Sequence, residues 1–312
     1  MAFVRLLAYH LFDPPGAGVI ARSFMIRVLT IGNSFAGNAT KWLPEIVEAD
    51  GTVDVMVGKT NLGGCSLEKH WNVVRQCELF PEVKPYAFSR TGLEPVPATL
   101  REALVAEPWD YVTLQQVSRL SWQPETYEPF FGQLLALVRE LAPQARPVIH
   151  QTWAHRVDAP WFEEAGIDQQ AMHEGLVRAY QATAEKYDLR MIPSGNAFAL
   201  ARRELNFSPD PNFDYLDPQP GALPRENGSL HVGGRWQTGN TPDGNAHFGI
   251  DPGHCSAPGL YLGAAVWFEM LTGRPIADND FHPEGVAESE IAILKAAAHQ
   301  AVVDAGGPLA KV

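Results

Sequence analysis

The chain has 312 residues, with 24 basic and 36 acidic side chains and a formal net charge of −12. This length suits one large α/β domain or two small ones. A surface this acidic repels phosphate backbones and anionic lipid, so the composition disfavours nucleic-acid binding and membrane insertion. The three cysteines, Cys65, Cys77 and Cys255, have no zinc-site spacing and cannot all pair, which indicates either a reducing compartment or simply a fold that does not depend on disulfides.

Residues 1–24 form a partly apolar extension before the first predicted strand. An Asp-Pro-Pro stretch at residues 13–15 interrupts it well short of a membrane-spanning length, and it has no clean signal-peptide cleavage site. Met25 stands directly before the strand. We therefore expect residues 1–24 to be a dispensable extension or the product of a wrongly assigned start. We further expect a single domain over residues 25–312 and a cytoplasmic protein.

Short apolar runs alternate with helical patterns along the rest of the chain. The apolar runs predict buried strands at residues 26–31, 53–57, 111–114, 147–150 and 190–192. Helical spacing predicts helices at residues 40–50, 67–79, 100–106, 128–141, 169–187, 196–204, 256–271 and 287–305. Strands that alternate with helices imply a parallel sheet covered on both faces. We expect an α/β fold: a three-layer α/β/α sandwich with a five-stranded, mostly parallel sheet of flavodoxin-like type.

Two stretches fall outside this alternation. Residues 80–98, rich in proline and aromatic residues, predict an extended excursion or a short hairpin. Residues 205–250 are dominated by Pro, Gly, Asn and Asp and have almost no periodicity. So long an irregular stretch inside a compact domain is usually functional. We expect this insertion to decorate the active-site edge as a lid or a pocket wall.

Four short stretches carry the residues with chemical potential: residues 32–34, 61–64, 114–116 and 251–254. The first three follow predicted strands, so they would cluster at one edge of the sheet with the loop that carries the fourth. Together they supply a hydroxyl nucleophile, amide donors, a base and a carboxylate, which is the set that acyl transfer needs. Each alone has an ordinary alternative, such as a helix cap, a Gly-Gly turn or a buried polar histidine.

Taken in order, these stretches resemble the sequence blocks of the SGNH (GDSL-like) hydrolases over roughly residues 25–275. The likeness is greatest to a branch whose members look like carbohydrate acetylesterases. Gly32–Asn33–Ser34 resembles the nucleophile block, with Asn33 where the common form has Asp. Asp251–Pro252–Gly253–His254 matches the Asp-x-x-His block.

The second and third blocks connect the chain to the acetylesterases. Gly63–Gly64–Cys65–Ser66–Leu67, followed by Trp71, resembles the Gly-Gly-Thr/Ser-x-x-x-x-Trp stretch of sialate and xylan acetylesterase relatives. The third block has Gln115–Gln116–Val117–Ser118 where most SGNH hydrolases have Gly-x-Asn-Asp. Counted from Asp110, Gln116 falls where the acetylesterase relatives carry the Gln of a His-Gln-Gly-Glu stretch. A Gln amide is also a donor, so the resemblance implies that Gln116 serves the oxyanion and that Gln115 is its inward-facing structural neighbour.

The resemblance implies a serine ester hydrolase that removes acetyl or other small acyl groups, in this branch from a carbohydrate. Ser34 would be the nucleophile, His254 the base and Asp251 the acid that orients it. The backbone N–H groups of Ser34 and Gly64 and the amide of Gln116 would form the oxyanion hole. The expected partner is a glycan or small-molecule ester, and no metal or organic cofactor is needed.

Four further residues are candidates for substrate contact. Asn33 and Gly63 adjoin block residues. Trp122 and Trp153 follow predicted strand ends, where their rings could line the pocket or stack on a sugar; plain packing is the alternative.

A metal site is a weaker hypothesis. His231, Asp243, His247 and Asp251 could in principle hold an ion, but their spacing matches no site template.

Two other functions compete with the carbohydrate esterase. A lipid-type esterase or lysophospholipase would need a wide apolar groove, and residues 205–250 are polar for that purpose. A non-catalytic glycan-binding protein on the same fold would have no need of the full set Ser34, His254 and Asp251.

Overall fold

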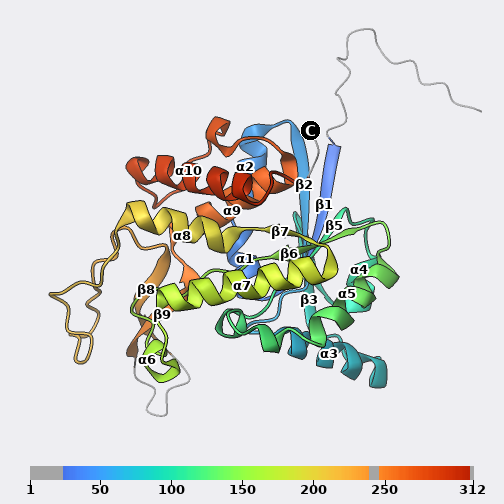
Figure 1. The fold of residues 1–312 in the computed structure, drawn as a ribbon, viewed down its shortest axis with the longest axis horizontal. Helices are drawn as coiled ribbons and strands as arrows, with labels where there is room; N and C mark the ends of the chain where they lie inside the picture. The colour runs from blue at the N-terminus through green and yellow to red at the C-terminus, as the bar shows by residue number, and fades with distance from the viewer. Residues whose placement is uncertain (1–23, 239–245, 310–312) are drawn as a thin grey trace, which may run out of the picture.

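The computed structural model describes residues 24–238 and 246–309 (Figure 1). At its centre is a seven-stranded sheet, which contains, in spatial order, β4 (Leu93–Ala98), β3 (Tyr86–Arg90), β2 (Val53–Lys59), β1 (Phe24–Ile31), β5 (Tyr111–Leu114), β6 (Arg146–His150) and β7 (Arg190–Ile192). Five of these strands, β2, β1, β5, β6 and β7, pair in parallel, and they are the five strands that the sequence predicted. Counted along the chain their order is 2-1-3-4-5, the flavodoxin-like arrangement that was expected.

The sheet has two more strands than predicted, because the segment 80–98 joins it. This segment forms the antiparallel hairpin β3–β4, and β3 pairs with the end of β2. Pro95 and Pro97 lie in β4, which is tolerable because β4 is the edge strand and proline cannot donate to a neighbour. The hairpin was predicted, but its place in the sheet was not.

Strand β1 is buried on both faces and divides the core in two. Ile26 and Val28 belong to one hydrophobic cluster, and Leu29 and Ile31 belong to the other. Successive side chains of a strand point to opposite faces, so this apolar run supplies both layers at once.

Helices cover both faces of the sheet, which confirms the three-layer sandwich. One face carries α1 (Ser34–Ala39), α2 (Leu43–Asp50), α8 (Ser194–Leu205), α9 (Ala257–Thr272) and α10 (Glu288–Asp304). The other carries α3 (Leu67–Leu79), α4 (Leu100–Val105), α5 (Phe130–Leu141) and α7 (Gln169–Tyr187). Figure 1 shows α10 and α8 in one layer and α3, α4 and α5 in the opposite one. The short α6 (Phe162–Ala165) was not predicted.

The insertion at 205–250 contains more regular structure than predicted. Its end forms an antiparallel ribbon of β8 (His231–Gln237) and β9 (His247–Cys255), separate from the main sheet. Both strands contain glycines, which interrupt the alternation of apolar and polar residues by which a strand is identified in a sequence. As a result, the Asp-x-x-His block lies within a strand and not in a loop. That the insertion acts as a lid or pocket wall stays a prediction.

The predicted extension over residues 1–24 lies outside the described residues, apart from Phe24, which begins β1. Its dispensability therefore stays a prediction, as do the domain limits. In the described part of the chain, no helix combines the length and apolarity needed to cross a membrane.

Candidate active site

Ser34 stands where β1 passes into α1, at the carboxyl edge of the sheet. It is the first residue of α1 and is partly exposed, and the preceding Asn33 caps the helix by accepting from the backbone N–H of Phe35 at 3.0 Å. A Cβ atom on Gly32 would lie 2.8 Å from Oε1 of Gln115, so glycine lets the end of β5 approach. The strand order reverses between β1 and β5, and open α/β sheets bind ligands at that point.

His254 comes from β9 and meets Ser34 across 220 residues of sequence. Its Nε2 lies 2.8 Å from the Oγ of Ser34. Its Nδ1 lies 2.9 Å from Oδ2 and 3.0 Å from Oδ1 of Asp251, three residues earlier. Because a carboxylate can only accept, Nδ1 carries the imidazole proton, and the bare Nε2 accepts from the serine hydroxyl.

Asp251 is buried, and its charge is stabilised by its neighbours. Burial alone would raise its pKa, but hydrogen bonds from the side chain and backbone N–H of His254, with the charges of His254 and Arg235, keep the pKa well below its usual range. The carboxyl is therefore ionised near neutral pH. An ionised acid beside an imidazole is the arrangement that supports general-base catalysis.

Several bonds hold β9 against the rest of the site. The backbone N–H of Cys255 donates to Oδ1 of Asn38 in α1 at 2.9 Å, which ties the histidine strand to the serine helix. The carbonyl of Gly253 accepts from Nε1 of Trp153 at 2.9 Å, and that of Pro252 accepts from the N–H of Arg156 at 2.9 Å. The Ser34–His254 pair is therefore set by contacts with α1 and with the segment after β6.

The loop after β2 brings backbone donors near Ser34. The N–H of Leu62 donates to the carbonyl of Gly32 at 3.1 Å, and Nδ2 of Asn33 donates to the carbonyl of Cys65 at 3.1 Å. Between them Gly64 has a φ of +59°, which favours glycine. Neither the N–H of Ser34 nor that of Gly64 donates to another described residue. That these two groups form the oxyanion hole stays a prediction.

Gln116 is not available for the role predicted for it. Its Oε1 accepts from the backbone N–H groups of Leu67 (3.1 Å) and Val117 (2.9 Å). Its Nε2 donates to the carbonyl (3.0 Å) and hydroxyl (3.2 Å) of Thr126. The amide is buried and fully used in joining the start of α3 to the loops after β5. The structure therefore does not support Gln116 as an oxyanion donor.

Two of the predicted substrate contacts are also buried. Both polar atoms of the Asn33 side chain are hydrogen-bonded within the protein: Nδ2 donates to Cys65, and Oδ1 accepts from Phe35 and also from Nε2 of Gln115 at 2.9 Å. Trp153 is fully buried between Phe35 and Phe198, with ring centroids 4.5 and 4.4 Å away. Both side chains are packed against α1, the helix that begins at Ser34, and both are too deeply buried to contact a substrate. Gln115 is the inward-facing neighbour that was expected.

The other two predicted substrate contacts, Trp122 and Gly63, remain predictions. Trp122 is partly exposed; it packs against Gly175 of α7 and donates its indole N–H to the carbonyl of Arg119 at 3.0 Å. Gly63 is exposed beside Gly64, and a Cβ atom there would meet no neighbour within 4 Å.

A second serine–histidine pair, not anticipated from the sequence, lies near the first. Nε2 of His155 is 2.9 Å from the Oγ of Ser118, and its Nδ1 accepts from the indole N–H of Trp161 at 2.8 Å. The ring of His155 stacks near that of Phe35, with centroids 6.1 Å apart. Burial, with the charges of Arg119 and other neighbours, lowers the pKa of His155 to about 3, so this imidazole is neutral.

The residues considered for a metal site have other roles where they are described. Nδ1 of His231 lies 3.3 Å from the carbonyl of Gly253, and its Nε2 accepts from Arg202 at 2.6 Å. Asp243 lies outside the described residues. Within 24–238 and 246–309, no three His, Cys, Asp or Glu side chains form a group that could hold a metal ion.

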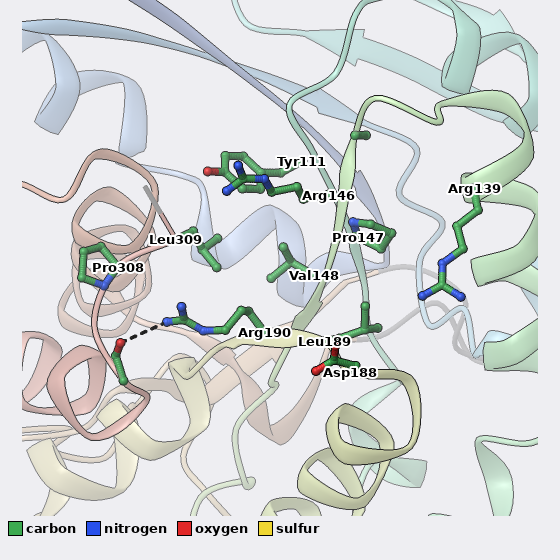
Figure 2. Close-up of a pocket in the computed structure, with 12 residues that line it drawn as sticks. Tyr111, Arg139, Arg146, Pro147, Val148, Asp188, Leu189, Arg190, Pro308 and Leu309 are labelled. Atoms are coloured by element: carbon green, nitrogen blue, oxygen red, sulfur yellow. Dashed lines mark hydrogen bonds between the residues drawn. The ribbon is translucent and has the colours of Figure 1, made fainter. Parts of the chain in front are cut away.

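A cavity of about 890 Å³ lies at the opposite edge of the sheet, around the amino ends of β5, β6 and β7 (Figure 2). Tyr111, Arg146 and Arg190 line it, and Pro308 and Leu309 close one side. The side chain of Arg190 donates to backbone carbonyls of the segment after α10 and so ties that segment to β7. The lining residues include no serine, cysteine or histidine. The arrangement suited to nucleophilic chemistry is therefore at Ser34 and not in this cavity.

Residues 27–214 match the family model described as a domain of unknown function, DUF4886. The chain belongs to the DUF4886 family. A DUF4886 family protein from Bacteroides uniformis has 28% identity and a TM-score of 0.71, over 89% of this chain and 95% of that one. This family member thus shares its overall fold with a solved relative of nearly the same extent.

Two further solved structures are less similar. A proposed SGNH hydrolase from Slackia heliotrinireducens has 21% identity and a TM-score of 0.46, over 78% of this chain and 98% of that one. A proposed GDSL-like lipase from Parabacteroides merdae has 13% identity and a TM-score of 0.44, over 79% and 95%. No curated protein matches the sequence significantly.

Proposed function

We propose that this DUF4886 protein is a serine ester hydrolase that works through Ser34, His254 and Asp251. The observation that carries the proposal is the hydrogen-bonded line from the Oγ of Ser34 to His254 (2.8 Å) and on to the buried carboxylate of Asp251 (2.9 Å). A nucleophile, a base within hydrogen-bond reach and a third group that orients the base together define this class of site.

The geometry supports acyl transfer in two halves. As the Oγ of Ser34 bonds to the ester carbonyl carbon, its proton passes to Nε2 of His254, and the carbonyl oxygen becomes negative. The N–H groups of Ser34 and Gly64 would stabilise that oxygen. When the bond to the leaving alcohol breaks, His254 returns the proton to the alcohol oxygen. Water then repeats the sequence on the acyl-enzyme and releases the acid.

The acyl and alcohol parts of the substrate are proposed from the sequence. The stretch Gly63–Leu67 with Trp71 resembles that of sialate and xylan acetylesterases, so we propose acetyl or another small acyl group on a carbohydrate. The polar insertion at 205–250 supports this substrate over a long-chain lipid, which would need an extended apolar surface.

Purified protein tests the proposal directly. Hydrolysis should be measured on p-nitrophenyl esters of increasing chain length and on acetylated xylan and monosaccharides, with Ser34→Ala as control. We expect turnover of the acetyl esters that disappears in Ser34→Ala. Turnover that survives this substitution would contradict the nucleophile assignment. A preference for long acyl chains would instead contradict the proposed substrate.

A further inference from the structure

Arg235 lies beside the acid of the candidate triad. It sits in β8 opposite Gly249 of β9, and Gly233, two residues earlier, lies opposite Asp251. From this diagonal position its Nη2 reaches Oδ2 of Asp251 at 3.1 Å. The arginine side chain is about half exposed, whereas the aspartate is buried.

The carboxylate of Asp251 is therefore shared among three partners. Its Oδ1 accepts from the backbone N–H of His254 at 3.1 Å and from that of Gly253 at 3.4 Å. Its Oδ2 faces Arg235, and both oxygens lie near Nδ1 of His254. Backbone donors on one oxygen and a guanidinium on the other leave the carboxylate one orientation, the one that faces the imidazole.

Other charged or titratable groups near this site contribute less directly. His155, from the segment after β6, faces Asp251 and His254, but burial keeps it neutral, with a pKa of about 3. Arg202 of α8 is buried and bonded to His231 and to the carbonyl of Ala154. Arg235, by contrast, touches the carboxylate itself.

We propose that Arg235 is a positioning residue that fixes Asp251 in the orientation that faces the imidazole of His254. The inference rests on the proposed function. The acid of such a triad acts by holding the base in one tautomer and one orientation, so a residue that holds the acid acts on the reaction through it.

Replacing the guanidinium tests the positioning. In Arg235→Gln, loss of orientation should lower kcat by about 10-fold, with KM changing by less than about 2-fold. Arg235→Lys keeps the charge but not the planar, two-pronged donor, so it should restore only part of kcat.

A matched control is Arg225→Gln. Arg225 forms a comparable exposed ion pair with Asp210, at 2.9 Å, within the same insertion. This substitution should leave kcat unchanged. An equal effect of the two substitutions, or a KM increase in Arg235→Gln as large as its kcat loss, would overturn the positioning role.

A proton NMR spectrum at fixed pH separates this inference from the proposed function. The signal of the Nδ1 proton of His254, which is hydrogen-bonded to Asp251, is assigned by its loss in His254→Gln and needs no turnover. We expect this downfield signal to weaken or to move upfield in Arg235→Gln, and to change less in Arg235→Lys. An unchanged signal in Arg235→Gln overturns the inference even if the protein is an esterase. A changed signal in a protein without esterase activity would sustain the Arg235–Asp251–His254 coupling while the proposed function fails.

Discussion

The two serine–histidine pairs of this molecule have nearly the same Oγ–Nε2 distance, but their hydrogen bonds run in opposite directions. Ser34 lies 2.8 Å from Nε2 of His254, and Ser118 lies 2.9 Å from Nε2 of His155. The distance between serine and histidine therefore does not distinguish a nucleophile from a structural hydroxyl.

The far nitrogen of each ring makes the difference. The carboxylate of Asp251 accepts from Nδ1 of His254, so Nε2 is left with a lone pair that can take a proton. The indole N–H of Trp161 donates to Nδ1 of His155, so the proton of that neutral ring is on Nε2 and is donated to Ser118. His155 thus cannot act as a base toward Ser118.

Exposure adds to the contrast. The side chain of His254 is 43% exposed, whereas His155 is 6% exposed. A catalytic imidazole must gain and lose a proton in each turnover, which a ring with a pKa of about 3 does not do near neutral pH. In the proposed esterase, the third residue and the solvent access therefore favour Ser34 over Ser118 as the nucleophile.

The largest expected effect on kcat comes from removing one residue of each serine–histidine pair in turn. His254→Ala should lower kcat by about 10⁵-fold, because the base is lost, whereas Ser118→Ala should change kcat by less than about 5-fold. Steady-state hydrolysis of p-nitrophenyl acetate measures both. Comparable losses in the two variants would mean that Ser118 takes part in the reaction.

The next largest effect is expected from changing the tautomer of His254 in the Ser34–His254 pair. In Asp251→Asn, the amide can donate to Nδ1 of His254, which imposes the tautomer that Trp161 imposes on His155. We expect kcat to fall by about 10⁴-fold with KM nearly unchanged. A kcat in Asp251→Asn that stays within about 10-fold of the wild-type value would be evidence against the orienting role.

A smaller effect is expected on the free energy of unfolding, which should depend on pH because of the buried histidines. Burial lowers the pKa of His150 and His155 to about 3 and that of His70 to about 4, against 6.5 for an ordinary histidine. Between about pH 6.5 and pH 4 the unfolded chain takes up protons that the folded protein refuses, so acid favours unfolding. Each such ring should remove about 1.4 kcal/mol of stability per pH unit in that window.

Urea unfolding at pH 7, 6 and 5 measures this slope. His150→Gln removes one titration and should make the slope shallower. A free energy of unfolding that stays constant from pH 7 to pH 5 would show that these rings can be protonated in the folded state.

Much of the fold could be predicted because its signals are local. The strand runs 111–114 and 190–192 and the helices 67–79 and 169–187 match the structure residue for residue, since apolar period and caps lie within each segment. The ribbon of β8 and β9 was missed because its glycines interrupt the alternation by which strands are identified.

The site was predictable where the chemistry is local and not where it depends on distant partners. Asp251 and His254 are three residues apart, and the structure brings them to Ser34; their roles stay predictions. Gln116 was misjudged because its amide bonds to Leu67, 49 residues away, which no local pattern reveals. Trp153 was misjudged because a tryptophan after a strand fits a pocket and a core equally well.

The most direct test of the account is the covalent labelling of serine by a fluorophosphonate. An activated serine reacts with this reagent, whereas a hydroxyl that only accepts a hydrogen bond does not. Peptide mapping of the wild-type protein should find a single label, on Ser34, and His254→Ala should abolish it. A label on Ser118, or no label under conditions in which the protein hydrolyses esters, would contradict the account.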